Sequence, residues 1–464
     1  MTAAVAWRLA DAVRATGAEV LATGAAVAFA RIATDSRTLT GGELFVALRG
    51  ERHDAHDHAA AAIAAGAAGL VVERPVALDD GRDATVLQVP DTLRALQDLA
   101  ADLRRRSAPC VLAITGSNGK TTTKEMLAAI LGAAGGAASV LKTSANLNNL
   151  IGVPLTLLGL TGAERHAVVE MGMSVPGEIW RLTEIADPDV GVITNVGPAH
   201  LEGVGSLAGV ARAKGELFAR MRAGATAVAN AEDTRVAALA DAFPGRVVRF
   251  GAGCEVAAEV VRCDAAGRAA FRLRVGGAAT EVHLRIPGAH NVQNALAAAA
   301  AAHAVGIGIE AIRAGLLLTE PVGSRMRVLT LPGGVTILDD SYNANPASVA
   351  AALRSLAASQ AARRIAVLGD MLELGPASAE LHGAIGRLVA ELGIDELYVY
   401  GTHARDTAAG AAAGRAPAAI HVAASHAAIA QALARSARAG DWILIKGSRG
   451  QRMEEVARLL GTAA

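Results

Sequence analysis

The sequence predicts an α/β protein with three domains. The chain has 464 residues, about three times the ~150 residues typical of one domain. Short apolar runs alternate with helical stretches along most of its length, which is the pattern of strands connected by helices. Hydrophobic residues make up 52% and aromatic residues only 3%, so we expect aliphatic cores. This composition excludes disordered chains, collagen and coiled-coil rods.

Residues 1–106 form the first predicted domain, a small α/β unit. Three apolar runs in it are predicted strands: 43–48, 69–72 and 85–89. The basic residues at 104–106, followed by Ser107 and Pro109, are typical of a solvated helix end and mark the boundary of the domain.

Residues 107–320 form the second predicted domain, which centres on a parallel sheet. Apolar runs separated by helical segments predict strands covered on both faces: 110–115, 167–170 and 190–194. The stretch 246–287 has few helix signals and is expected to be rich in β-structure. An Ala-rich helix is predicted at 291–304.

Residues 321–464 form the third predicted domain, after a linker with Pro and Gly near 319–324. Five apolar runs alternate with helical segments and are predicted strands: 335–339, 364–369, 396–400, 420–422 and 442–445. This alternation predicts a doubly wound, Rossmann-like domain.

Charge and cysteine usage exclude several classes of protein. Lys and Arg number 44, as do Asp and Glu, so no global basic field would attract nucleic acid or anionic lipid. No apolar run reaches the roughly 20 residues that a membrane-spanning helix needs. The three cysteines (Cys110, Cys254 and Cys263) form no CxxC pair, and we expect reduced thiols in a cytoplasmic protein.

The strongest local signal is the segment 115–122, between a predicted buried strand and a helix. Glycines at 116 and 119 let the backbone turn its amides toward an anion, and the helix N-terminus adds a positive dipole. Lys120 supplies a cation, and the Thr121 hydroxyl can hold Mg²⁺. The strict phosphate-loop pattern would need Gly at position 114, where this chain has Ile114. The segment therefore predicts a variant phosphate loop, and the alternative is a Gly-rich turn without a ligand.

Glu170 and His200 follow two other predicted strands of the same sheet. Because the carboxyl ends of parallel strands meet at one edge, both side chains are expected near the phosphate loop. The alternatives are a capping Glu and a turn-stabilising His. Lys214 is one of only five lysines among the 44 basic residues. Since this chain otherwise uses Arg as its cation, Lys214 is a candidate for chemistry that needs an amine.

Polar residues also gather after three predicted strands of the third domain: 339–346, 368–375 and 446–450. Asn345 and Pro346 are explained as the N-cap and first residue of a helix. The cluster Asp339, Asp340, Ser341 and Asn343 exceeds what a cap needs, which favours a functional role. For the other two segments the alternative is an ordinary turn or surface loop.

Together, the phosphate loop, Glu170, the spacing from His200 to Lys214 and the segment 290–294 resemble the Mur ligases, which are ATP-dependent amide-forming enzymes of bacterial peptidoglycan synthesis. The resemblance covers all three domains in the family's order. It implies a ligase that joins D-alanyl-D-alanine to UDP-N-acetylmuramoyl-tripeptide through an acyl phosphate, on the strength of four segments: 34–37, 42–48, 340–346 and 368–375. An Asp-Asn-Pro-Arg motif, expected of the diaminopimelate-adding relative, is absent. The alternatives are a Mur-type ligase for a single amino acid, a ligase like folylpolyglutamate synthase, and a nucleotide-binding scaffold without activity.

The resemblance also implies roles for individual residues. The expected catalytic residues are Lys120, Glu170, His200 and Lys214. ATP would be bound by Gly116, Ser117, Asn118, Gly119, Lys120, Thr121, Thr122, Asn291, Arg325, Asp339 and Asp340. One Mg²⁺ would be held by Thr121 and Glu170, and a second by His200 and a carbamylated Lys214. The substrates would be bound by Ser36, Asn146, Asn343, Asn345 and Lys446. We expect a monomer.

Overall fold

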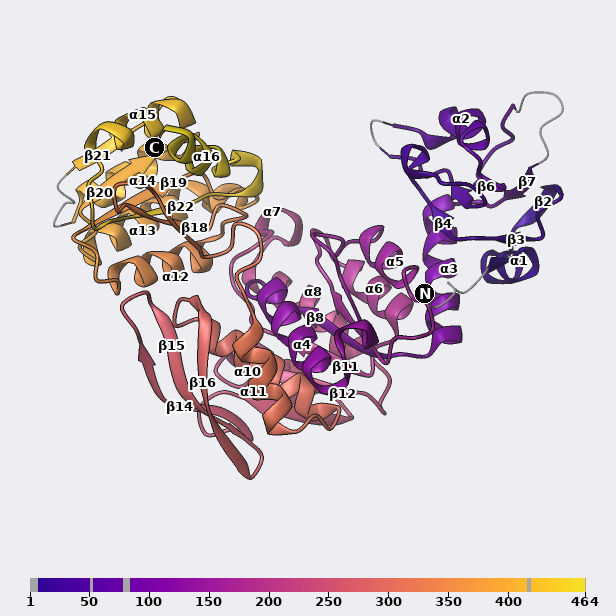
Figure 1. Ribbon diagram of the computed structural model, residues 1–464, viewed down its shortest axis with the longest axis horizontal. Helices are drawn as coiled ribbons and strands as arrows, with labels where there is room; N and C mark the ends of the chain where they lie inside the picture. The colour runs from indigo at the N-terminus through magenta and orange to yellow at the C-terminus, as the bar shows by residue number, and fades with distance from the viewer. Residues whose placement is uncertain (1–6, 51–52, 78–83, 415–418, 464) are drawn as a thin grey trace.

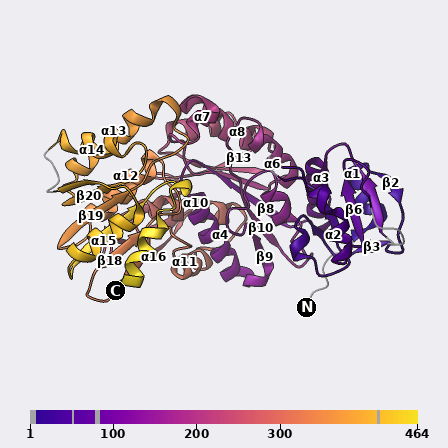
Figure 2. The same cartoon turned by 90° about the horizontal axis from the view of Figure 1, so that it is seen from above.

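The computed structural model describes residues 7–50, 53–77, 84–414 and 419–463. Three regions follow one another along an elongated molecule, with the first and third at opposite ends of the central one in both views (Figures 1 and 2). No helix of the described ranges is long and apolar enough to span a bilayer.

The first region is built on a five-stranded sheet with the order β2-β7-β6-β5-β4. Four of these strands run parallel, and β2 pairs antiparallel with β7. A pair of short strands, β1 and β3, lies beside it. The elements are β1 (Trp7–Arg8), α1 (Leu9–Thr16), β2 (Glu19–Ala22), β3 (Ala28–Phe29), β4 (Ile32–Ala33), β5 (Leu44–Val46), α2 (Ala59–Ala64), β6 (Gly69–Val72) and β7 (Thr85–Gln88). All three strands predicted for this region are present.

Helix α3 (Thr92–Ser107) connects the first region to the central one and packs on it. Leu96, Leu99 and Leu103 are buried in the same hydrophobic cluster as residues of the central helices. The basic residues at 104–106 form the last turn of α3, and Ala108 ends it in the left-handed conformation. The predicted boundary at 106 therefore lies at the end of a helix that shares its core with the next region, and the domain limits stay a prediction.

The central region contains a nine-stranded sheet with the order β16-β15-β14-β13-β12-β11-β8-β10-β9. The strands from β9 to β14 pair in parallel, and β14, β15 and β16 form an antiparallel extension. The strands are β8 (Cys110–Thr115), β9 (Val140–Lys142), β10 (His166–Glu170), β11 (Val190–Ile193), β12 (Thr226–Asn230), β13 (Arg246–Phe250), β14 (Val256–Cys263), β15 (Arg268–Val275) and β16 (Ala278–Pro287). The predicted β-rich stretch is confirmed as strands β13 to β16. The short strands β9 and β12 were not predicted.

Helices cover both faces of this sheet: α4 (Lys120–Gly135), α5 (Gly152–Leu157), α6 (Glu178–Ala186), α7 (Leu201–Val204), α8 (Leu207–Arg220), α9 (Thr234–Asp241), α10 (Asn291–Ala304) and α11 (Ile309–Leu318). Successive residues of β8 alternate between two cores. Leu112 packs in the cluster that includes α4 and α10, and Val111 packs in the one that includes α3 and α6. Small side chains allow close packing, because a Cβ at Gly315 of α11 would lie 2.3 Å from the Cα of Ile130 in α4.

The third region has a six-stranded sheet with the order β17-β18-β22-β19-β20-β21. Among its described strands, only the edge strand β17 pairs antiparallel. The five predicted strands are all present, in a doubly wound arrangement. The elements are β17 (Arg327–Thr330), β18 (Thr336–Asp339), α12 (Pro346–Ala357), β19 (Arg363–Leu368), α13 (Ser378–Glu391), β20 (Glu396–Val399), α14 (Ala404–Ala412), β21 (Ala419–Val422), α15 (His426–Ser436), β22 (Asp441–Lys446) and α16 (Glu454–Ala463).

Candidate active site

The segment 115–122 runs from the last residue of β8 through a loop at 116–119 into the first turn of α4, as predicted. Its outer side is held by the segment that follows β11. The Ser117 hydroxyl donates to the carbonyl of Gly197 at 2.9 Å, and the amide of Asn118 donates to Asn195 Oδ1 at 2.9 Å. The loop is therefore rigid on one side, while the N-terminus of α4 provides unpaired amides and a positive dipole on the other.

Two glycines of this loop are required by both conformation and space. Gly116 has φ +149°, and a Cβ there would lie 1.9 Å from Thr194 Oγ1. Gly119 has φ +81°, and a Cβ there would lie 2.0 Å from Asn294 Oδ1. A side chain at either position would move the loop, because the neighbouring polar groups are themselves buried.

Glu170, at the end of β10, contacts the phosphate loop directly. The Thr121 hydroxyl donates to Glu170 Oε2 at 2.8 Å, and Asn148 Nδ2 donates to Oε1 at 2.8 Å. The amide of Glu170 donates to the Thr143 hydroxyl at 2.9 Å. Only 2% of Glu170 is exposed. The sequence-based expectation that Thr121 and Glu170 lie together is confirmed.

Two lysines near this edge, Lys120 and Lys214, have lowered pKa values. Lys120 Nζ donates to the Gly116 carbonyl at 2.8 Å. Enclosure by the protein lowers the pKa of Lys120, and the Glu170 carboxylate opposes this effect. The pKa of Lys214 lies well below the usual lysine value because the amine is buried, and the positive charge of Lys120 adds to the effect. Within the described ranges, the amine of Lys214 has no hydrogen-bond or ion-pair partner.

His200 is the N-cap residue that precedes α7, in the left-handed conformation with φ +54°. Its Nδ1 lies 2.5 Å from Oε2 of Glu373, which belongs to the third region. The hydrogen bond from His200 lowers the pKa of the Glu373 carboxyl and so favours its ionised form. The structure records no direct contact of His200 with either Glu170 or Lys214 in the described part of the chain. The three residues are thus not gathered into one contacting cluster.

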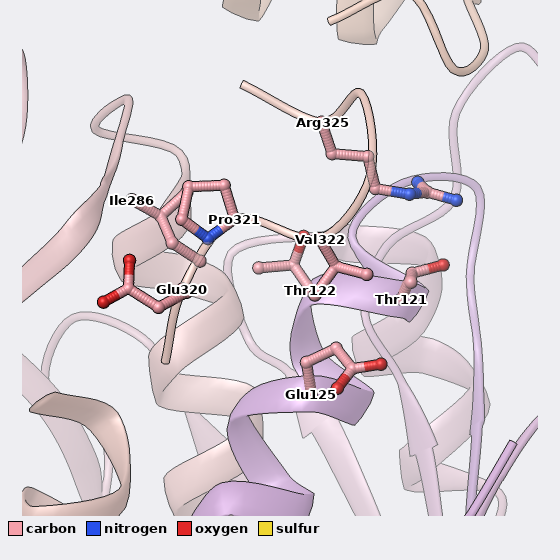
Figure 3. Close-up of a pocket in the computed structure, with 8 residues that line it drawn as sticks. All are labelled: Thr121, Thr122, Glu125, Ile286, Glu320, Pro321, Val322 and Arg325. Atoms are coloured by element: carbon pink, nitrogen blue, oxygen red, sulfur yellow. The ribbon is translucent and has the colours of Figure 1, made fainter. Parts of the chain in front are cut away.

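Arg325 reaches the same edge from the linker between the central and third regions. Its guanidinium lies 4.0 Å from the ring centre of Tyr342, and Figure 3 shows the side chain extending toward Thr121 at the start of α4. A pocket lies here, lined by Thr121, Thr122, Glu125, Ile286, Glu320, Pro321, Val322 and Arg325. A cation and a helix N-terminus therefore face one pocket, and the acidic residues Glu125 and Glu320 line it too. Its volume of about 10 Å³ has room for a water-sized group only.

The candidate residues of the third region bond mainly to one another. Asp339 Oδ1 accepts from the backbone amide and the hydroxyl of Ser341 at 3.1 and 2.6 Å. Lys446 Nζ lies 2.5 Å from Asp340 Oδ2 and donates to the Asn343 carbonyl at 2.9 Å. Lys446 is only 3% exposed. These contacts fix the loops after β18 and β22 to each other.

Asn345 joins the third region to the phosphate loop. It is the N-cap of α12 in a capping box with Ser348, and Pro346 follows it, as predicted. Its Nδ2 also donates to Asn118 Oδ1 at 2.8 Å. Asn345 therefore both caps α12 and contacts the phosphate loop of the central region.

Asn291 and Asn294 lie on one turn at the start of α10. Asn291 donates to the Pro287 carbonyl at 2.7 Å and accepts from Asn294 at 2.8 Å. Both residues are buried. Asn294 in turn lies against Gly119, so this pair supports the phosphate loop from the side of the helix.

Ser36 and Asn146 lie apart from these contacts. Ser36 begins a 3-10 helix (Ser36–Thr38) in the first region, capped by Asp35. Asn146 is exposed in the loop between β9 and α5. Neither side chain contacts the phosphate loop in the described structure.

The residues present suit Mg²⁺ at the phosphate edge. Among the residues that the structure describes, no three His, Cys, Asp or Glu side chains lie close enough to hold a metal ion. A hydroxyl and a carboxylate do lie together, as Thr121 and Glu170. Mg²⁺ commonly takes one or two carboxylates and completes its shell with water and substrate phosphates, so this oxygen pair fits it.

Three functional candidates were missed by the sequence analysis: Asn148, Asn294 and Glu373. Asn148 lies in an Asn-rich loop that follows β9. Because β9 was not predicted, no sequence pattern placed this loop beside Glu170. Asn294 is part of the motif at 290–294, and its spacing of one helical turn from Asn291 was a usable signal. Glu373 lies in the segment 368–375, which the sequence analysis singled out, but nothing local identifies its partner, which is 173 residues away.

Three family models match this chain. They are the "Mur ligase family, catalytic domain" at residues 29–104, the "Mur ligase middle domain" at 114–302 and the "Mur ligase, glutamate ligase domain" at 324–449. Their order is the order of the three regions in the structure.

Named relatives agree with these models. The UDP-N-acetylmuramoyl-tripeptide–D-alanyl-D-alanine ligase of Escherichia coli (strain K12) is 41% identical over 444 residues, which cover 94% of this chain and 95% of that protein. A crystal structure of MurF from Acinetobacter baumannii superposes with a TM-score of 0.91 at 34% identity, covering 99% of this chain and 100% of the other. MurF ligase from Thermotoga maritima in complex with ADP gives a TM-score of 0.83 at 29% identity, covering 93% and 97% of the two chains. The chain belongs to the Mur ligase family.

Proposed function

We propose that this protein is an ATP-dependent ligase that joins D-alanyl-D-alanine to UDP-N-acetylmuramoyl-tripeptide in the synthesis of peptidoglycan precursors. The observation that carries the proposal is the phosphate loop beside the Thr121–Glu170 pair, in a chain 41% identical to a ligase of that name over 94% of its length. The likeness to ADP-bound MurF of Thermotoga maritima supports a nucleotide at this edge.

The reaction has two steps. The γ-phosphoryl group of ATP is transferred to the terminal carboxylate of the tripeptide, giving ADP and an acyl phosphate. The amine of the dipeptide then attacks the acyl carbon, and the tetrahedral intermediate releases inorganic phosphate as the amide forms and the amine loses a proton. Because a carboxylate is a poor electrophile and a phosphate is a good leaving group, the first step makes the second possible.

The residues of the loop position and neutralise the phosphates. We place the phosphates against Gly116, Ser117, Asn118, Gly119 and Thr122, with the free amides at the start of α4 directed at them, and Lys120 adds a positive charge. Bound phosphates favour the protonated amine of Lys120, which opposes the lowering of its pKa by enclosure. Arg325 approaches from the linker, and we place Asp339, Asp340 and Asn291 around the rest of the nucleotide.

Thr121 and Glu170 hold one Mg²⁺, and His200 with Lys214 serves a second. When bound, the ions neutralise charge on the transferring phosphoryl group. Glu170 is preoriented for this role by Asn148 and by Thr143.

Lys214 is carbamylated on its amine. The buried, unpaired amine has a lowered pKa, and its neutral form is the one that reacts with CO₂. The product is an anion with oxygen ligands, which suits a hard cation, whereas an ammonium group would repel it.

The three regions divide the substrates between them. The first binds the UDP-muramoyl end, with Ser36 near the nucleotide and Asn146 nearer the peptide. The third binds the dipeptide through the loops that carry Asn343, Asn345 and Lys446. The limits 1–106, 107–320 and 321–464 are our proposed domains. Since all these groups come from one chain, the proposal requires only a monomer, and its use of ATP places it in the cytoplasm.

An acceptor panel tests the proposal. Phosphate release with ATP and UDP-N-acetylmuramoyl-tripeptide is measured with D-alanyl-D-alanine, D-alanine, D-glutamate or diaminopimelate as the amine. The dipeptide should be used at least on the order of a hundredfold better than any single amino acid, because buried polar groups left unpaired discriminate strongly. Equal turnover with a single amino acid would refute the assignment of the acceptor. Absence of ATP-dependent turnover with every amine would refute the ligase itself.

A further inference from the structure

One contact between the central and third regions involves a residue that the proposed function leaves without a role. His200 Nδ1 lies 2.5 Å from Glu373 Oε2, and the amide of Glu202 donates to the Glu373 carbonyl at 3.1 Å. We propose that Glu373 is a positioning residue, whose carboxylate holds the His200 imidazole in the tautomer that can bind a metal ion. This inference rests on the proposed function, in which His200 serves the second Mg²⁺.

The tautomer follows from the hydrogen bond. An ionised carboxylate can only accept hydrogen bonds, so the proton of a neutral His200 must be on Nδ1. The lone pair is then on Nε2, one of the two ring nitrogens through which a neutral imidazole can bind a metal ion, and the one that does not face Glu373. Within the described ranges, Nε2 of His200 has no hydrogen-bond partner, so it remains available. A carboxylate that accepts from the second nitrogen is a common support for a metal-binding histidine.

The loop that carries Glu373 is anchored on both sides. Met371 and Leu374 are 2% and 1% exposed, and the amide of Leu372 donates to the Ser448 hydroxyl at 2.9 Å. Glu373 itself has φ +62°, an unfavourable conformation for a residue with a Cβ that persists only where the surroundings impose it. The carboxylate is therefore presented at a fixed place by the third region.

Because Glu373 and His200 belong to different regions, the orientation of the imidazole depends on the third region being docked. The second metal position would then be complete only when the part of the protein proposed to bind the dipeptide is in place. Glu202 offers a matched control. It is an exposed carboxylate two residues from His200, and its side chain has no hydrogen bond in the described structure.

The test compares the full-length variants Glu373→Ala, Glu373→Gln and Glu202→Gln with the wild type. The first readout needs neither metal nor nucleotide: NMR of ¹⁵N-histidine-labelled protein reports the tautomer, and the His200→Gln spectrum assigns the His200 signals among the 12 histidines. The wild type should show protonated Nδ1. Glu373→Ala should shift His200 toward protonated Nε2, whereas Glu373→Gln should retain the wild-type tautomer, because an amide oxygen still accepts.

The second readout is the Mg²⁺ dependence of phosphate release. In Glu373→Ala the half-saturating Mg²⁺ concentration should rise roughly tenfold or more, with kcat at saturating Mg²⁺ changed much less. Glu373→Gln should show a smaller rise, and Glu202→Gln should match the wild type. An unchanged tautomer in Glu373→Ala, a Mg²⁺ shift below about twofold, or an equal shift in Glu202→Gln would overturn the proposal. Failure of the ligase function would instead appear as absent turnover in the wild type, with the tautomer measurement still interpretable.

Discussion

The phosphate edge of the central sheet and the contact between the central and third regions are built differently. Glu170 is buried, and its partners Thr121 and Asn148 come from the same region. His200 and Glu373, in contrast, come from two regions, and their side chains are 27% and 53% exposed. The first set is thus assembled within one region before any ligand binds, whereas the second set exists only while two regions are docked. The comparison indicates that the phosphate-binding part of the site is formed within the central region. The rest of the site forms only when the third region is docked.

The largest effect on activity should come from a substitution in the phosphate loop, which is formed within the central region. Lys120→Ala should lose ATP-dependent phosphate release by on the order of a thousandfold, because the phosphate loop loses its cation. The melting temperature should stay near that of the wild type, since the Lys120 amine makes one backbone hydrogen bond. Lys142→Ala is the matched control, because that lysine is a half-exposed ion-pair partner of Glu125. Phosphate release close to the wild-type rate in Lys120→Ala would contradict the phosphate-loop assignment.

A second prediction concerns the buried amine of Lys214. Lys214→Ala should lose activity on the order of a hundredfold, and small carboxylic acids should restore part of it by replacing the carbamate oxygens. Lys214→Arg should not be rescued, because a guanidinium stays protonated and cannot react with CO₂. Native mass spectrometry of active enzyme should show one carbamate. An unmodified amine in active enzyme, or full activity of Lys214→Arg, would exclude the carbamate role.

The lowered pKa of Lys214 predicts the pH dependence of this modification. Only the neutral amine reacts with CO₂, and a pKa below the usual lysine value raises the neutral fraction at a given pH. Carbamylation should therefore be complete above the lowered pKa and should be lost as the pH falls through it. Bicarbonate added to CO₂-depleted enzyme should restore activity at high pH and restore less at low pH, and an effect of the opposite sign would contradict the assignment.

The smallest effect is expected at a second contact between the central and third regions, the hydrogen bond from Asn345 to Asn118. Asn345→Ala removes the cap of α12 and the hydrogen bond to Asn118, and should cost about 1 kcal/mol of stability, a few degrees in melting temperature. Ser348→Ala removes only the other half of the capping box. A double-mutant cycle with Asn118→Ala isolates the contact between regions. Additive effects in that cycle would mean that the contact contributes nothing to docking.

Local patterns were enough for most of the architecture. Most strands of the central and third sheets were predicted because buried parallel strands are continuous apolar runs, as at 110–115 and 363–368. The edge strands β9 and β17 were missed, since they are only partly buried and carry little apolar signal. Strand β12 was missed although all five of its residues are buried, because its sequence has only one branched aliphatic side chain, Val228. The phosphate loop was predicted because its glycines, lysine and threonine lie within one segment and act through backbone geometry.

What the sequence alone determined is the chemistry that resides in single segments: the phosphate loop, the cap of α12 and the parallel sheets. The parallel strands also predicted that Glu170 meets the phosphate loop, but the tertiary structure decided the other contacts between distant groups. It joined Glu170 to Asn148, buried Lys214 without a partner for its amine in the described part of the chain, and brought Glu373 to His200 across 173 residues. The physical reason is that turns and helix ends depend on neighbours along the chain. Hydrogen bonds between loops depend instead on how whole sheets pack and dock, which no local pattern encodes.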